Sequence, residues 1–132
     1  MRGHAALIRA TDGRIGARLP GLPPLLLLDH VGARSGKLRT TPLVYMPQGD
    51  DMLIVASKGG HPRHPAWLHN LRAHADTEVQ IGRRRMKVHA REAKAEERRR
   101  LWPEAADYNP HWGRYRERTS REIPLVLLEP RS

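Results

Sequence analysis

Apolar residues gather in short runs along the chain, and glycine-rich or charged segments separate these runs. Leu25 to Val31 is almost continuously apolar, which predicts a buried strand. A second strand is predicted from Leu38 to Met46, and the two form a hairpin around Gly32 to Gly36. A third strand is predicted from Met52 to Ala56. The first half of the chain therefore favours antiparallel β-structure.

The second half of the chain mixes helical and alternating patterns. Apolar residues at helical spacing follow two prolines, and a strictly alternating pair of segments surrounds a Gly-Arg turn. Two segments of high helical propensity and a final apolar run complete the chain. The predicted elements are a helix at Ala66–His74, strands at Thr77–Ile81 and Arg84–Glu92, helices at Ala93–Ala106 and Tyr108–Arg118, and a strand at Ile123–Leu128.

This order of elements predicts an α+β fold that is mostly β. About six antiparallel strands with flanking helices are expected to close into a small barrel. Residues 1–22 are expected to form an N-terminal flap with a short helix over 4–19, and residues 23–130 the barrel. No linker or repeat divides the 132 residues, so residues 1–132 are predicted to form one domain.

The charge balance says more about possible ligands and partners than the rest of the composition does. The chain has 24 Lys and Arg against 14 Asp and Glu, a net charge of +10. Such an excess fits nucleic acid, an anionic membrane surface, a polyanionic small ligand or a solvated basic face. It peaks in residues 82–87 and 98–100, without the interleaved aromatic residues of an RNA-binding motif. We therefore expect no nucleic-acid partner.

The absence of cysteine excludes disulfides and thiolate metal sites, and it fits a reducing cytoplasm. No apolar run approaches the roughly 20 residues that a membrane-spanning helix needs. The first residues also lack the apolar core of a signal peptide. We therefore expect a cytoplasmic protein with no transmembrane segment, and contact with a membrane surface stays open.

Two glycine-bearing turns are the strongest candidates for ligand binding. The stretch from Gly32 to Leu43 combines glycine, serine, arginine and lysine, and Ser57 to Gly60 repeats this combination after the third strand. Glycine lets a backbone approach a phosphate closely, and cationic side chains supply the opposite charge. If the turns lie at the same end of adjacent strands, they converge on one anion. The alternative for the first stretch is an ordinary basic hairpin turn.

Other side chains are weaker candidates. Histidines at 61, 64, 69 and 74 could hold a metal, but no His-Glu-x-x-His pattern accompanies them, so no metal is predicted. No nucleophile-elbow motif or close carboxylate pair is present. The aromatic cluster from Tyr108 to Tyr115 fits a helix docked on the barrel or a wall over a flat ring system. If the protein is an enzyme, we therefore expect its chemistry to belong to a bound cofactor.

Four motifs in order carry a resemblance over residues 14–130. The chain resembles the deazaflavin-dependent nitroreductases, small actinobacterial split-barrel oxidoreductases that use coenzyme F-420. The motifs are Gly32-x-Arg34-Ser35-Gly36-x-x-Arg39-x-x-Pro42-Leu43, Ala56-Ser57-Lys58-Gly59-Gly60, Pro65-x-Trp67-x-x-Asn70-Leu71 and Tyr115-x-x-x-Thr119-x-Arg121-x-Ile123-Pro124.

The resemblance implies a split β-barrel like that of FMN-binding proteins, with the reduced deazaflavin in a cationic groove. It assigns different parts of the coenzyme to different motifs. Its cofactor contacts are Arg34, Ser35 and Arg39 at the phosphate and oligoglutamate tail, Pro42 and Leu43 along the ring system, Ala56, Ser57, Lys58 and Gly59 at the phosphate and ring edge, and Trp67 and Asn70 closing the groove.

The implied activity is hydride transfer from reduced coenzyme F-420 to an electron-poor acceptor such as a quinone, an enone or a nitroaromatic. Tyr115, Tyr108 or solvent would supply the proton, and Ser57 would bind developing negative charge on the acceptor. Asn109 and Trp112 stand where nitro-reducing relatives carry tyrosines, so nitroimidazole reduction stays open.

Three alternatives remain from the sequence. The chain could bind or carry coenzyme F-420 without turnover, its barrel could hold FMN, or its basic surface could bind nucleic acid. The sequence leaves the choice between a monomer and a homodimer open.

Overall fold

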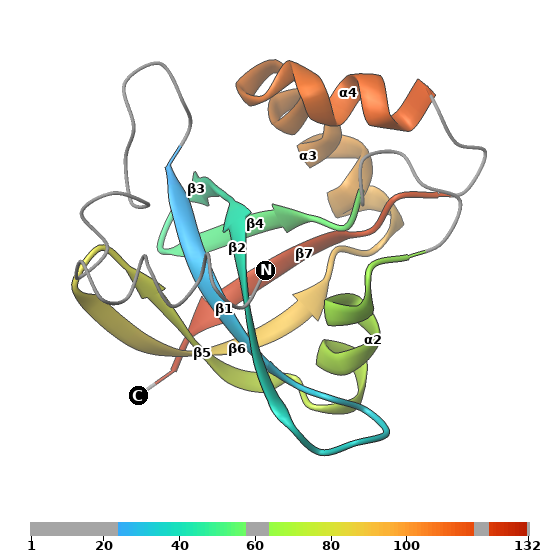
Figure 1. Ribbon diagram of the computed structural model, residues 1–132. Helices are drawn as coiled ribbons and strands as arrows, with labels where there is room; N and C mark the ends of the chain where they lie inside the picture. Colours follow the sequence, from blue (N-terminus) through green and yellow to red (C-terminus); the bar gives the residue numbers. More distant parts are fainter. Residues whose placement is uncertain (1–23, 58–63, 118–121, 132) are drawn as a thin grey trace.

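Seven antiparallel strands form a single curled sheet (Figure 1). The computed structural model describes residues 24–57, 64–117 and 122–131, so the predicted flap and its helix lie outside the described residues. The strands follow the order β2-β1-β5-β6-β7-β4-β3 across the sheet. Their bounds are β1 Leu25–Val31, β2 Leu38–Val44, β3 Met46–Gln48, β4 Asp51–Val55, β5 Asp76–Ile81, β6 Arg84–Glu92 and β7 Leu125–Pro130.

Three described helices accompany the sheet, and the predicted α+β class with a mostly antiparallel sheet is confirmed. Figure 1 shows α3 and α4 together at one end of the sheet and α2 beside the hairpin of β1 and β2. The helices are α2 Ala66–Ala73, α3 Ala95–Tyr108 and α4 Pro110–Glu117.

The second predicted strand, Leu38–Met46, is in fact two strands. The chain bends at Tyr45, after which β3 pairs with β4 instead of β1. Because β2 and β3 are the two ends of the sheet order, the sheet must curl until its ends meet at this residue. Each of these edge strands holds a proline, Pro42 or Pro47, as expected where a strand has a neighbour on one side.

The barrel interior is filled by alternate residues of the central strands and sealed by α2. On β7, Val126 and Leu128 point inward, while Leu125 and Leu127 pack against a second core outside the barrel. Both faces of this strand are buried, which explains why its sequence is a continuous apolar run. The inward residues from α2 are Trp67, Leu68 and Leu71.

The second core lies where α3 and α4 cover the outer faces of β4 and β7. Leu101, Trp102 and Ala105 from α3 are buried there with Trp112 from α4. Arg98 adds to this contact, because its guanidinium lies over the Trp102 ring at 5.4 Å from the ring centroid. The two late helices therefore support the barrel wall.

Strand β1 divides its polar residues between two faces. Leu26 and Leu28 face the barrel interior, and alternation puts His30 on this same face. Asp29 points to the other face, where its carboxylate accepts hydrogen bonds from Thr40 and from Arg85, at 2.8 Å each. His30 and Asp29 are both buried, so the end of β1 next to the turn is a polar cluster within an apolar strand.

Candidate functional site

The turn between β1 and β2 is held by its own backbone. The Gly32 N–H donates to the Lys37 carbonyl, and the Gly36 N–H donates to the Gly32 carbonyl, both at 2.9 Å. Gly36 has a φ of 69°, a conformation that glycine adopts without strain. The Ser35 hydroxyl accepts from the Lys37 N–H at 3.2 Å. The glycines of this motif therefore fix the shape of the turn.

Asn70 on α2 ties this turn to the helix. Its Oδ1 accepts from the Ala33 N–H at 2.9 Å, and its Nδ2 lies 2.9 Å from His30 Nδ1. The other ring nitrogen of His30 lies 2.9 Å from Thr41 Oγ1. Asn70 is 7% exposed and His30 3%, so the hydrogen bond between these two side chains is shielded from water. Sequence reasoning missed His30, although two polar residues, Asp29 and His30, near the end of a strand that is otherwise apolar were a visible signal.

A cavity of about 680 Å³ lies between the turn and α2. Two of its lining side chains, Arg34 and Arg39, are exposed and have no acidic partner among the described residues. By contrast, Arg72, Arg85 and Arg91 all form ion pairs. Two uncompensated guanidinium groups make the cavity attractive to an anion. The lining residues are Gly32, Ala33, Arg34, Ser35, Arg39, Ala66, His69 and Asn70.

Several predicted contact residues lie outside this cavity. Ala56 and Trp67 are buried in the barrel core, and Leu43 packs against the same core. Pro42 is next to Leu43 on β2, so alternation directs its side chain to the opposite face. Ser57 is buried at the end of β4. The structure thus brings together Arg34, Ser35, Arg39 and Asn70 of the predicted cofactor set.

The strands that precede the two glycine turns are not hydrogen-bonded to each other. β1 pairs with β2 and β5, whereas β4 pairs with β3 and β7. The continuous β2–β3 segment separates the strands that precede the two turns, because it contributes both edges of the sheet. Lys58 and Gly59 of the second turn lie outside the described residues, so their role stays a prediction.

The late aromatic segment is packed against the barrel wall. The rings of Tyr108 and Trp112 are stacked, with centroids 6.1 Å apart, and Trp112 is buried in the second core. The Asn109 side chain accepts from the His111 N–H at 3.2 Å at the start of α4. Asn109 and Trp112 therefore have structural roles here. Tyr115 is in α4, but its side chain lies outside the described part of the molecule.

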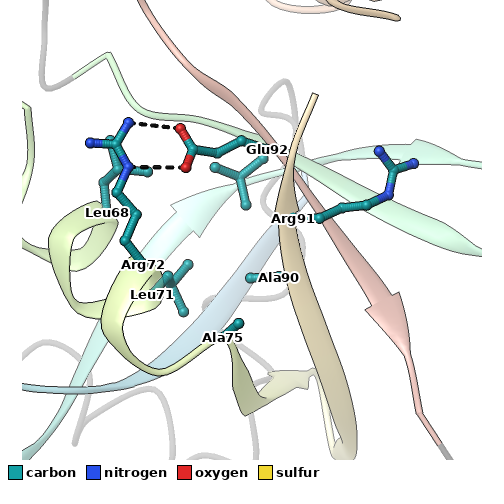
Figure 2. A pocket seen from close by; sticks show the side chains of 8 residues that line it. Leu68, Leu71, Arg72, Ala75, Ala90, Arg91 and Glu92 are labelled. Carbon is teal, nitrogen blue, oxygen red and sulfur yellow. Dashed lines mark hydrogen bonds and ion pairs between the residues drawn. The ribbon is translucent and has the colours of Figure 1, made fainter. Parts of the chain in front are cut away.

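A second, smaller cavity lies between α2 and the strands β6 and β7 (Figure 2). Its volume is about 210 Å³, below the roughly 300–1,000 Å³ typical of ligand pockets. Arg72 and Glu92 close one side, with two hydrogen bonds of 2.9 and 2.7 Å between the guanidinium and the carboxylate. Both arginines that line it, Arg72 and Arg91, already form ion pairs, so this cavity is a poorer anion site than the one beside the turn.

The Arg72–Glu92 pair gives a first testable prediction. The side chains are 43% and 39% exposed, so we expect Glu92→Gln to lower the free energy of unfolding by less than about 1 kcal/mol at pH 7. The hydrogen bonds from Arg72 hold the pKa of Glu92 below its ordinary value. The pair therefore stabilises the fold above the unfolded-state pKa, and this contribution disappears as the pH falls through the folded-state pKa. Urea unfolding of the wild type and Glu92→Gln at pH 7 and pH 3 measures the difference in unfolding free energy. A larger difference at pH 3 than at pH 7 would contradict the prediction.

A methyl group at Gly32 gives a second prediction, because it would overlap the Ser35 hydroxyl. We expect Gly32→Ala to displace Ser35 from the Lys37 N–H and to cost about 1 kcal/mol of stability. Adding Ser35→Ala removes the clash, since the next atoms lie 3.6 Å from the new Cβ. Denaturation of the two single variants and the double variant measures the coupling. Additive effects would contradict the predicted overlap.

The described residues contain no group of three or more acidic or histidine side chains that could hold a metal ion. No helix in residues 24–57, 64–117 or 122–131 has the length and apolarity that crossing a bilayer requires.

The curled antiparallel sheet with a cationic cavity at one hairpin defines a small β-barrel protein. Comparison with known proteins makes the class specific, because the model of the F420H(2)-dependent quinone reductase family matches residues 1–130. This chain belongs to that family. The resemblance to deazaflavin-dependent reductases is therefore confirmed, and the barrel is of the split type.

Individual relatives agree with the family match. The chain is 46% identical over 134 aligned positions to the F420H(2)-dependent quinone reductase Rv1261c of Mycobacterium tuberculosis, covering 99% of this chain and 90% of the relative. A solved F420-H2 dependent reductase, FDR-A, is 36% identical with a TM-score of 0.73, covering 85% of this chain and all of that one. Another solved structure, described as a domain-swapped dimer, is 35% identical with a TM-score of 0.75, covering 96% and 93% of the two chains.

Proposed function

We propose that this chain transfers a hydride from reduced coenzyme F-420 to a quinone, with the coenzyme held at the cavity between the β1–β2 turn and α2. The observation that carries the placement is the pair Arg34 and Arg39 beside a glycine turn, which have no acidic partner in the part of the chain that the structure describes. The family match supports the reaction and the coenzyme.

The residues of the cavity fit the anionic part of the coenzyme, because its phosphate and glutamates need cationic partners. Arg34 and Arg39 would hold these groups, because both residues line the cavity. The volume of about 680 Å³ lies in the usual range for small-molecule sites. Binding should weaken as salt rises, because the exposed guanidinium groups are screened.

The reduced deazaflavin supplies the hydride when it is bound. The chain itself binds the anionic tail through Arg34 and Arg39 and keeps the turn fixed to α2 through Asn70. A proton for the reduced quinone would come from Tyr115, Tyr108 or solvent, and Ser57 would hydrogen-bond negative charge on the acceptor. The half-buried Tyr108 stacks on Trp112, which restrains its position beside the barrel.

Binding and turnover need separate measurements. Titrating the protein with oxidised and reduced deazaflavin, FMN and NADP establishes which cofactor it holds. Anaerobic oxidation of the reduced deazaflavin is then followed against a panel of quinones, enones and nitroaromatics. We expect tight deazaflavin binding and turnover with quinones. Binding without turnover would favour a carrier, whereas a yellow protein that binds FMN alone would overturn the proposal.

Tyr115 provides a prediction about the proton. If its hydroxyl donates to the reduced quinone, Tyr115→Phe lowers kcat by about 10- to 100-fold and leaves the coenzyme Kd unchanged. Tyr108→Phe tests the alternative donor, since it removes the same atom from the neighbouring helix, and it should leave kcat unchanged if Tyr115 is the donor. Steady-state kinetics of both variants measure the effect. An unchanged kcat in both variants would assign the proton to solvent.

The oligomeric state is a further part of the proposal. One similar solved structure is described as a domain-swapped dimer, which supports testing this chain as a homodimer. Light scattering on the purified protein distinguishes a dimer from a monomer.

A further inference from the structure

The hydrogen bonds around His30 determine which of its ring nitrogens carries the proton. A backbone N–H can only donate, so the Asn70 atom that faces Ala33 must be the carbonyl oxygen. The Asn70 amide group then faces His30 and donates to Nδ1, which must be unprotonated. The proton of the neutral ring is therefore on Nε2, where it can be donated to the Thr41 hydroxyl.

We propose that His30 is a positioning residue of the coenzyme site. As the neutral ring protonated on Nε2, it orients the Asn70 amide and thereby holds the Ala33 end of the turn that carries Arg34. This inference rests on the proposed function, because it assigns His30 to the site that would bind the coenzyme. His30 itself does not line the cavity, so it acts through Asn70.

The geometry explains why a histidine suits this position. Hydrogen bonds from His30 reach β2 on one side of the ring and α2 on the other, so one side chain links both walls of the cavity. An aliphatic side chain would leave the Asn70 amide group without its buried acceptor, and the amide could then turn away from Ala33. The register also pairs His30 with Arg39 across the two strands, which places this link directly beside the second cavity arginine.

Protonation of His30 would break the link, because a doubly protonated ring cannot accept from Asn70. The charged groups acting on the ring are Arg39 on β2 and Asp29 on β1, while α2 presents the uncharged Asn70. Burial and, to a smaller extent, Arg39 lower the pKa of His30, and Asp29 opposes them. The link is therefore intact at neutral pH and is lost as the pH falls through this lowered pKa.

The first test uses the protein without coenzyme. Two-dimensional NMR of the imidazole nitrogens of wild-type protein should show a neutral ring with the proton on Nε2. Hydrogen exchange of the Ala33 amide should be slow in the wild type and at least tenfold faster in His30→Leu. The His30→Asn variant keeps an oxygen acceptor near the position of Nδ1, so it should restore most of the protection.

The Ala90 amide, which donates to the Ala75 carbonyl at 2.8 Å, is the internal reference for exchange. Its protection should be the same in all three proteins if the variants keep their fold. A proton on Nδ1 in the wild type, or unchanged Ala33 exchange in His30→Leu at equal Ala90 protection, overturns the inference. If His30→Leu does not fold, the wild-type imidazole spectrum and the His30→Asn exchange rate decide it.

The second test measures the coenzyme affinity against pH. We expect the wild-type Kd for the deazaflavin to rise about tenfold as His30 becomes protonated, with a midpoint at the NMR pKa of His30. In His30→Asn this step should be absent, since no titrating ring remains. A step that persists in His30→Asn overturns the inference. A wild type with the expected ring proton and Ala33 protection that binds no deazaflavin overturns the proposed function instead, and leaves the link between His30, Asn70 and the turn in place.

Discussion

Replacing Arg34 and Arg39 together with alanine should raise the Kd for the reduced deazaflavin by roughly 100- to 1,000-fold. Each guanidinium in the cavity is free of acidic partners among the described residues and is available to an anion. Hydrogen bonds to charged groups contribute about 1.5–3 kcal/mol each, so losing two costs roughly 3–4 kcal/mol after partial compensation by solvent. Fluorescence titration at low and high salt measures the change.

The matched control removes the same charge from another surface. Arg84 on β6 and Arg99 on α3 are exposed, and neither lines the cavity beside the turn. We expect the double variant Arg84→Ala with Arg99→Ala to bind within about threefold of the wild type, because exposed charges beyond about 10 Å are largely screened. If this control loses as much affinity as the cavity variant, the net charge of the protein explains binding and the cavity does not.

Two leucine substitutions, one in the core and one on the surface, should differ strongly in their effect on the free energy of unfolding. Leu28 on β1 is completely buried, whereas Leu38 at the start of β2 is 58% exposed. We expect Leu28→Ala to lower the free energy of unfolding by about 2–5 kcal/mol, through lost burial and the cavity that remains. Leu38→Ala is the control and should change it by less than about 0.5 kcal/mol. Urea unfolding of both variants measures the difference.

Similar losses in the two leucine variants would contradict the assignment of Leu28 to the barrel core. They would also contradict the exposed position of the Leu38 side chain.

Local pattern was enough to predict most elements of this fold. The alternating pattern over Arg84–Glu92 predicted a strand, and Met86, Val88 and Ala90 on one face of that strand contact the barrel core. The bounds Leu25–Val31 and Arg84–Glu92 were also predicted correctly. Apolar periodicity reflects which face of a strand is buried. It therefore predicts the bounds of a strand well where that strand keeps the same partner along its length.

The bend at Tyr45 could not be predicted from that periodicity. Residues on both sides of it continue to read as one strand, since β2 and β3 differ only in the partner strand that they pair with. Partner choice is a tertiary property. The prolines at 42 and 47 are typical of edge strands, but they give no position for the bend.

The candidate site was predictable in part for the same reason. The glycine turn with Arg34 and Arg39 is a local motif, and its cationic character is visible in the sequence. The link through His30 joins residues 40 positions apart, so it needs the three-dimensional structure. The helix was predicted at Ala66–His74 and spans Ala66–Ala73, yet only its packing places Trp67 in the barrel core and Asn70 at the turn.

The positions of Pro42 and Pro47 also bear on self-association. Pro42 and Pro47 each have a partner residue on the one neighbouring strand. Because proline lacks an N–H, the outer side of each edge strand presents one hydrogen-bond donor fewer. An extended peptide that pairs with either edge strand would therefore lack one backbone hydrogen bond. The bend that completes the barrel thus leaves two edge strands that pair poorly with other chains. This protects a small β-rich protein against edge-to-edge aggregation at high concentration.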